Sequence, residues 1–103
     1  MPRFENVAIV KQANVYFDGK CVSHTVVFPD GTKKTVGVIL PSTLTFNTSS
    51  PERMEGVAGR CEVRIADAEA WIEYSPGQSF DVPGGSSFEI RCREPYHYVC
   101  HFG

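Results

Sequence analysis

Helical periodicity is almost absent from this sequence of 103 residues, and no segment approaches the ~18 to 20 consecutive apolar residues of a membrane-spanning helix. A basic stripe is also missing, because the ten Lys and Arg residues are scattered and the formal net charge is -2. Non-specific binding of nucleic acid needs such a stripe to neutralise phosphates, so we expect no nucleic-acid partner. The first residues lack the apolar run of a secretory signal, which favours a cytoplasmic protein without a membrane partner.

Paired cysteine motifs are lacking as well, since none of the four cysteines forms a CxxC pair. Cys21, Cys61, Cys92 and Cys100 are even in number, as in a disulfide framework. Without an export signal, however, they are better interpreted as reduced thiols on packed strands.

Strand signals recur at short intervals instead. Turn signals separate them at Asp18-Gly19, Pro29-Asp30-Gly31, Pro41-Ser42, Pro76-Gly77 and Pro83-Gly84-Gly85. This pattern predicts one all-β domain over residues 1–103, a sandwich or a closed barrel. The predicted strands are 14–17, 21–28, 35–40, 43–48, 53–57, 61–65, 70–74, 79–82, 87–91 and 96–102.

Residues 43–48 alternate in a way that places a candidate site. Thr43, Thr45 and Asn47 share one face of this strand, and Leu44, Phe46 and Thr48 share the other. Either the polar face points into the domain and offers hydroxyl and amide groups to a ligand, or it faces solvent with Leu44 and Phe46 in the core.

The spacing of residues 77–88 resembles the second cupin motif, with Phe88 at the position of the metal-binding histidine. Residues 45–59 have the glutamate-to-glycine spacing of the first cupin motif, with Thr45 and Asn47 at its two histidine positions and Glu52 at its glutamate. The resemblance implies a single cupin-like β-barrel of the jelly-roll type. Only Glu52 is a strong ligand in this set, so we expect no metal.

Four strings identify a narrower resemblance: NVYFDGK at 14–20, TFNTSSPERM at 45–54, FDVPGGSSF at 80–88 and EPYHYVC at 94–100. Read together, they are similar to the small bacterial pyrimidine/purine nucleoside phosphorylases over nearly the whole length. The resemblance implies an enzyme, a pentosyltransferase that splits purine and pyrimidine nucleosides with inorganic phosphate into free base and pentose 1-phosphate. No cofactor is expected, and nucleosides and phosphate are the expected partners.

This chemistry needs donors for phosphate, stabilisation of an oxocarbenium-like ribosyl centre and contacts to the leaving base. Glu52 and Lys20 are the candidate catalytic residues, for the ribosyl centre and for phosphate. Candidate stacking partners of the base are Phe88, Phe46 and Tyr98, although all three could simply be core residues. The further substrate-binding candidates are Thr45, Asn47, Thr48, Arg53 and Ser86.

Two other functions stay open at this stage. A metal-dependent cupin enzyme with unusual ligands is one, and His97 and His101 share a face of the last strand that suits either a metal or a polar outer surface. A non-catalytic cupin that binds a small molecule is the other. Because strand pairing between subunits would cover open sheet edges, we also predict a homodimer.

Overall fold

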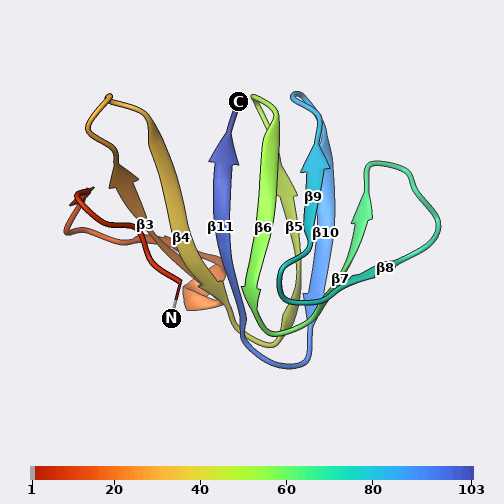
Figure 1. The fold of residues 1–103 in the computed structure, drawn as a ribbon. Helices are drawn as coiled ribbons and strands as arrows, with labels where there is room; N and C mark the ends of the chain where they lie inside the picture. The colour runs from red at the N-terminus through yellow and green to blue at the C-terminus, as the bar shows by residue number, and fades with distance from the viewer. Residues whose placement is uncertain (1) are drawn as a thin grey trace.

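The computed structural model describes residues 2–103, which form two antiparallel β-sheets with one short 3₁₀ turn, η1 (Phe17–Gly19) (Figure 1). The larger sheet has the strand order β1-β3-β4-β11-β6-β9, with β2 also paired to β3. Its strands are β1 (Ala8–Ile9), β2 (Asn14–Tyr16), β3 (Cys21–Val27), β4 (Lys33–Ile39), β6 (Glu52–Ala58), β9 (Ser79–Val82) and β11 (Tyr96–Phe102). No helix in the described chain is long and apolar enough to cross a bilayer.

The smaller sheet has the order β5-β10-β7-β8. Its strands are β5 (Ser42–Asn47), β7 (Cys61–Ile65), β8 (Ile72–Tyr74) and β10 (Ser87–Cys92). All ten strands that the sequence predicts are present, with ends that differ by at most two residues. The strand that the sequence analysis missed is β1, which is two exposed residues long and carries too little pattern to be recognised.

The core lies between the two sheets and is made by alternate residues of both. Ile39 and Tyr96 from the larger sheet and Val63 and Ile90 from the smaller one are almost completely buried there. The four cysteines are also buried and unbridged, each on a strand, as the sequence predicts. A small apolar thiol suits this environment.

The structure decides which face of β5 points inward. Leu44 is buried, while Thr45 and Asn47 are exposed. Leu44 pairs with Ile90 and Phe46 with Phe88 on β10, so the apolar residues of both strands share one face and bury it together. The hypothesis of a polar interior face is therefore wrong, and the alternative with Leu44 and Phe46 inside is correct.

Strand pairing does not close the expected barrel. Within residues 2–103 each sheet keeps its own order, and no ladder joins one to the other. The all-β prediction is confirmed, and the arrangement is that of two facing sheets, so that a space between them opens at the end of the sandwich where β5 ends and β6 begins.

Candidate active site

A cavity of about 190 Å³ opens between the sheets and is lined by residues from seven strands, β2, β3, β4, β5, β6, β10 and β11. Its wall contains one carboxylate, two tyrosines, three phenylalanines and several small polar groups. The lining residues are Tyr16, Ser23, Thr35, Phe46, Asn47, Glu52, Met54, Phe88, Tyr98, Cys100 and Phe102.

Glu52 is the one carboxylate in this lining and the first residue of β6. Its side chain is half-buried, and the Cys100 thiol donates a hydrogen bond of 3.5 Å to Oε1. Burial raises the pKa of Glu52, and the Cys100 hydrogen bond partly opposes this effect. A carboxylate in such a place interacts more strongly with a nearby positive charge than one in bulk water.

Aromatic rings form one wall of the cavity. Phe46 stacks on Phe88 with ring centroids 5.3 Å apart and an interplanar angle of 19°. Phe17 meets Phe46 edge-on at 5.3 Å, and Phe80 meets Phe88 at 5.7 Å. Since Phe88 is only 2% exposed, Phe46 is the member of this stack that lies nearer the opening.

Tyr98 lines the cavity from β11, with its hydroxyl 3.4 Å from the Cys21 thiol. Gly37 on β4 makes room for this ring, because a Cβ at Gly37 would lie 2.7 Å from the Tyr98 hydroxyl. Burial raises the pKa of Tyr98 well above its ordinary value, so its hydroxyl is neutral at physiological pH.

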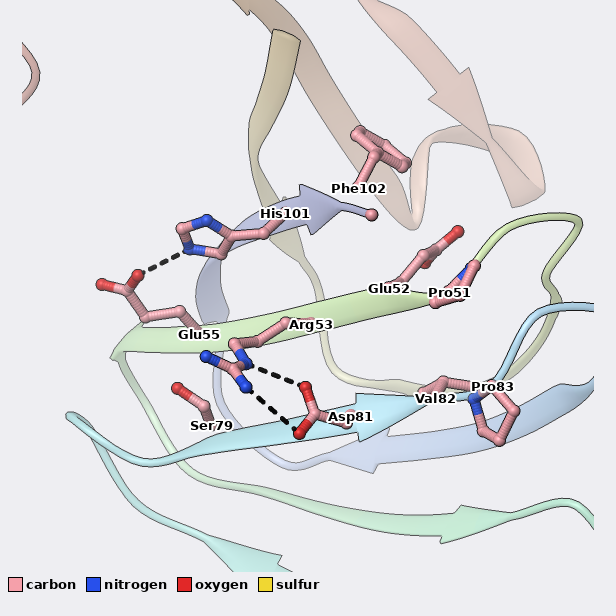
Figure 2. Close-up of a pocket in the computed structure, with 11 residues that line it drawn as sticks. Pro51, Glu52, Arg53, Glu55, Ser79, Asp81, Val82, Pro83, His101 and Phe102 are labelled. Carbon is pink, nitrogen blue, oxygen red and sulfur yellow. Dashed lines mark hydrogen bonds and ion pairs between the residues drawn. The ribbon is translucent and has the colours of Figure 1, made fainter. Parts of the chain in front are cut away.

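A second hollow, an open groove of about 630 Å³, crosses the outer side of β9, β6 and β11 (Figure 2). Arg53 forms a forked pair with Asp81 there, with hydrogen bonds of 2.8 and 3.4 Å. Glu52 and Phe102 line both hollows. The two spaces are therefore neighbours at the end of β6, and Glu52 is the acidic group that they share.

His101 lies on the outer side of β11, in the groove. Lys34 Nζ lies 2.7 Å from its Nδ1, and Glu55 Oε1 lies 2.8 Å from its Nε2. A lysine ammonium can only donate, so Nδ1 accepts and Nε2 carries the hydrogen that reaches Glu55. Both ring nitrogens are thus occupied, and the interpretation of His97 and His101 as a polar outer face fits this arrangement.

The structure brings five of the sequence-predicted site residues to the cavity, namely Phe46, Asn47, Glu52, Phe88 and Tyr98. The other five lie elsewhere: Lys20, Thr45, Thr48, Arg53 and Ser86 do not line it. Thr45 is exposed on the outer side of β5, opposite Glu89 of β10. Lys20 is exposed at the end of η1, four residues after Tyr16.

Thr48 and Ser86 belong to a structural clamp. The Thr48 hydroxyl donates to the Pro83 carbonyl at 2.6 Å and accepts from the Ser86 amide at 3.1 Å. These bonds tie the end of β5 to the turn at residues 83–86, in which Gly85 has a positive φ of 62°. The Thr48 hydroxyl proton is therefore used in the hydrogen bond to the Pro83 carbonyl.

Sequence analysis missed six lining residues: Tyr16, Ser23, Thr35, Met54, Cys100 and Phe102. They come from five strands of the larger sheet, and only the register of that sheet brings them together. Tyr16, Met54 and Cys100 lie inside the family strings, which is a signal that could have identified them.

The interior positions do not suit a transition metal. Phe46 and Phe88 point to the core beside Glu52, and Thr48 is occupied by the backbone. The part of the chain that the structure describes has no group of three or more His, Cys, Asp or Glu that could hold a metal ion. First-row metals bind imidazole, thiolate and carboxylate, and Glu52 with the single Cys100 thiol beside it is an incomplete ligand set.

Comparison with known proteins places the chain in a family. The family model described as pyrimidine/purine nucleoside phosphorylase matches residues 11–102. The chain belongs to this family. A pyrimidine/purine nucleoside phosphorylase of Dechloromonas aromatica (strain RCB) is 70% identical over 103 residues, which cover all of both chains.

Two solved structures share the fold of this chain. A protein of unknown function from Acinetobacter sp. ADP1 superimposes with a TM-score of 0.96 at 53% identity, over 98% of each chain. A putative ethanolamine utilization protein from Salmonella typhimurium LT2 matches with a TM-score of 0.68 at 14% identity, over 92% of this chain and 94% of the other. At this identity the second likeness shows the fold alone, which is cupin-like.

Proposed function

We propose that the protein catalyses phosphorolysis of purine and pyrimidine nucleosides, with Glu52 acting at the ribosyl centre. The observation that carries this proposal is a half-buried carboxylate beside an aromatic wall, in a member of the pyrimidine/purine nucleoside phosphorylase family. In the reaction, the bond from the ribosyl C1′ to the base breaks and its electron pair leaves with the base. An oxygen of hydrogen phosphate forms the new bond to C1′, and its proton passes to the departing base.

Glu52 would stabilise the positive charge that develops at C1′ as the base leaves. An ionised carboxylate in a partly water-excluded cavity interacts with the transition state more strongly than with the neutral substrate, which raises kcat. Because burial raises the pKa of Glu52, the acidic limb of the pH-rate profile belongs to this group.

The aromatic wall accounts for activity on both classes of base. Stacking accepts any base because each one has a π face. Phe46 and Tyr98 are the better placed partners, while Phe88 supports Phe46 from behind. Asn47 at the rim and Ser23 within the cavity supply hydrogen-bonding groups for ribose or base.

Lys20 is our candidate for the residue that binds phosphate. Arg53 already has its guanidinium bound by Asp81 on the outer face, which leaves it poorly placed to grip phosphate. Lys20 has no carboxylate within 4.0 Å among residues 2–103, and it follows the η1 turn that carries Phe17 against Phe46. Its flexible stem can bring the ammonium to the rim.

The rest of the proposal concerns assembly and conditions. Residues 1–103 act as a single cupin-like jelly-roll domain in the cytoplasm, as a homodimer, and without a metal. Exposed Ile9, Val15, Val57 and Ile72 lie on or near edge strands and outer faces that a second copy could cover. Light scattering after size exclusion tests the dimer, for which a mass near 23 kDa, twice the 11.4 kDa chain, is expected. A monomer at all concentrations would refute it.

The enzyme assay compares base release from uridine and adenosine with and without inorganic phosphate. Release that depends on phosphate supports the proposal, and no release refutes it. Glu52→Gln should lower kcat about a hundredfold, which corresponds to ~3 kcal/mol of lost transition-state stabilisation. Glu55→Gln is the matched control, because Glu55 lies on the same strand but contacts His101 on the outer face.

A further inference from the structure

The Cys100 thiol forms a hydrogen bond with the Glu52 carboxylate in the wall of the cavity. Cys100 lies on β11, between Thr35 of β4 and Met54 of β6 in the strand register. Its side chain points inward and is 5% exposed, and its Sγ lies 3.5 Å from Glu52 Oε1. In residues 2–103 this is the one hydrogen bond that the Glu52 carboxylate makes with the protein.

The direction of this hydrogen bond follows from the chemistry of the two groups. Burial, followed by the nearby Glu52 charge, raises the pKa of Cys100 to about 12. The thiol is therefore protonated at physiological pH, and an ionised carboxylate can only accept. A donor to the charged form favours ionisation of Glu52, against the effect of burial.

The other ionisable groups around Cys100 and Glu52 do not replace the thiol as a hydrogen-bond donor to the carboxylate. Tyr98 and Cys21 face the interior but contact each other at 3.4 Å, and Tyr16 lies at the rim. The charged residues Lys34, Arg53 and His101 are engaged on the outer face. Lys34 contacts His101, His101 contacts Glu55, and Arg53 pairs with Asp81. No cation lines the cavity in the described chain.

We propose that Cys100 is a positioning residue of the reaction, which orients the Glu52 carboxylate and keeps it ionised. This inference rests on the proposed role of Glu52 in phosphorolysis. Cys100 does not act as a nucleophile here, because its thiol stays protonated and it contacts the carboxylate and not the reacting atoms. Its effect is exerted through Glu52, so it must be visible in the titration of that group.

The test compares pH profiles of kcat/KM for the parent, Cys100→Ala and Cys100→Ser. Loss of one hydrogen bond to a charged group should move the acidic limb of Cys100→Ala to higher pH by about 0.5 to 1 unit. Cys100→Ser retains a hydrogen-bond donor, so the acidic limb of its pH profile should stay near that of the parent. Cys61→Ala is the matched control, because it removes another buried thiol away from the cavity and should leave the limb in place.

A second measurement separates this inference from the proposed function. The ¹³C chemical shift of the Glu52 carboxyl, assigned by its loss in Glu52→Gln, reports its titration without turnover. A Glu52 pKa that rises in Cys100→Ala and recovers in Cys100→Ser supports the inference. An unchanged Glu52 titration in Cys100→Ala, or an equal shift in Cys61→Ala, overturns it. Absence of turnover in the parent overturns phosphorolysis instead, while the carboxyl titration still decides whether Cys100 controls Glu52.

Discussion

Gly37→Ala should damage the cavity from behind, through Tyr98. A methyl group at this position would lie 2.7 Å from the Tyr98 hydroxyl, 2.8 Å from its Cζ and 2.8 Å from the Val22 carbonyl oxygen. Carbon atoms do not approach these groups so closely, so the β3 backbone at Val22 and the Tyr98 ring must both move. The movement separates the Tyr98 hydroxyl from Cys21 and pushes the ring into the space that it lines.

The size of the effect follows from these contacts. Overpacking of a tight core costs about 1 to 3 kcal/mol, and loss of a buried hydrogen bond adds about 1 kcal/mol. We therefore expect Gly37→Ala to destabilise the protein by about 2 to 4 kcal/mol, which lowers Tm by roughly 10 to 30 °C in a chain of this size. Nucleoside KM should rise at the same time, because Tyr98 lines the cavity.

Thermal unfolding of a double-mutant cycle measures this contact directly. In a Tyr98→Leu background the Gly37→Ala change should cost at least ~1 kcal/mol less than in the parent, because the ring is gone. Gly56→Ala is the matched control: its Cβ would lie 3.3 Å from Tyr96, a contact that small shifts relieve. Equal costs in both backgrounds, or equal costs at Gly37 and Gly56, would refute the reasoning.

Three further predictions concern charge and metal. Lys20→Ala should raise the phosphate KM more than the nucleoside KM, while Arg53→Ala, whose side chain pairs with Asp81 outside the cavity, should change neither; steady-state kinetics with each substrate varied decides. Burial raises the pKa of Glu52, so its ionisation opposes folding as pH rises through that pKa. The Tm of Glu52→Gln should therefore rise relative to that of the parent as the pH increases above the ordinary pKa of glutamate, and a constant difference would contradict this sign. Turnover should survive EDTA, and Phe88→His should bind no stoichiometric iron or nickel, because one imidazole beside Glu52 is an incomplete ligand set; activity lost to EDTA and restored by metal would contradict this.

The fold was largely predictable because its signals are local. Period-two alternation and the turn strings at 29–31, 76–77 and 83–85 locate the strands without knowledge of their partners. The inward face of β5 was not predictable in the same way. Thr45 and Leu44 differ by one position, and the choice between their faces depends on pairing with Ile90 of β10, which is a distant contact.

The site was predictable only where a motif fixed the position of a side chain. Glu52 and Phe88 lie on the cavity, as the cupin spacing implies. Arg53 follows Glu52 directly, so it must point to the opposite face of β6, where it meets Asp81. Cys100 is brought to Glu52 by the pairing of β11 with β6, across 48 positions of sequence, and no local pattern reveals such a contact.

Product analysis by ³¹P NMR tests the central claim most directly. When purified protein is incubated with uridine and inorganic phosphate, the account predicts a pentose 1-phosphate resonance that grows in step with free uracil, one for one, and a Glu52→Gln sample in which both form about a hundredfold more slowly. Uracil released without loss of inorganic phosphate would mean hydrolysis and would contradict phosphorolysis. Equal rates in the parent and in Glu52→Gln would contradict the role of the cavity carboxylate.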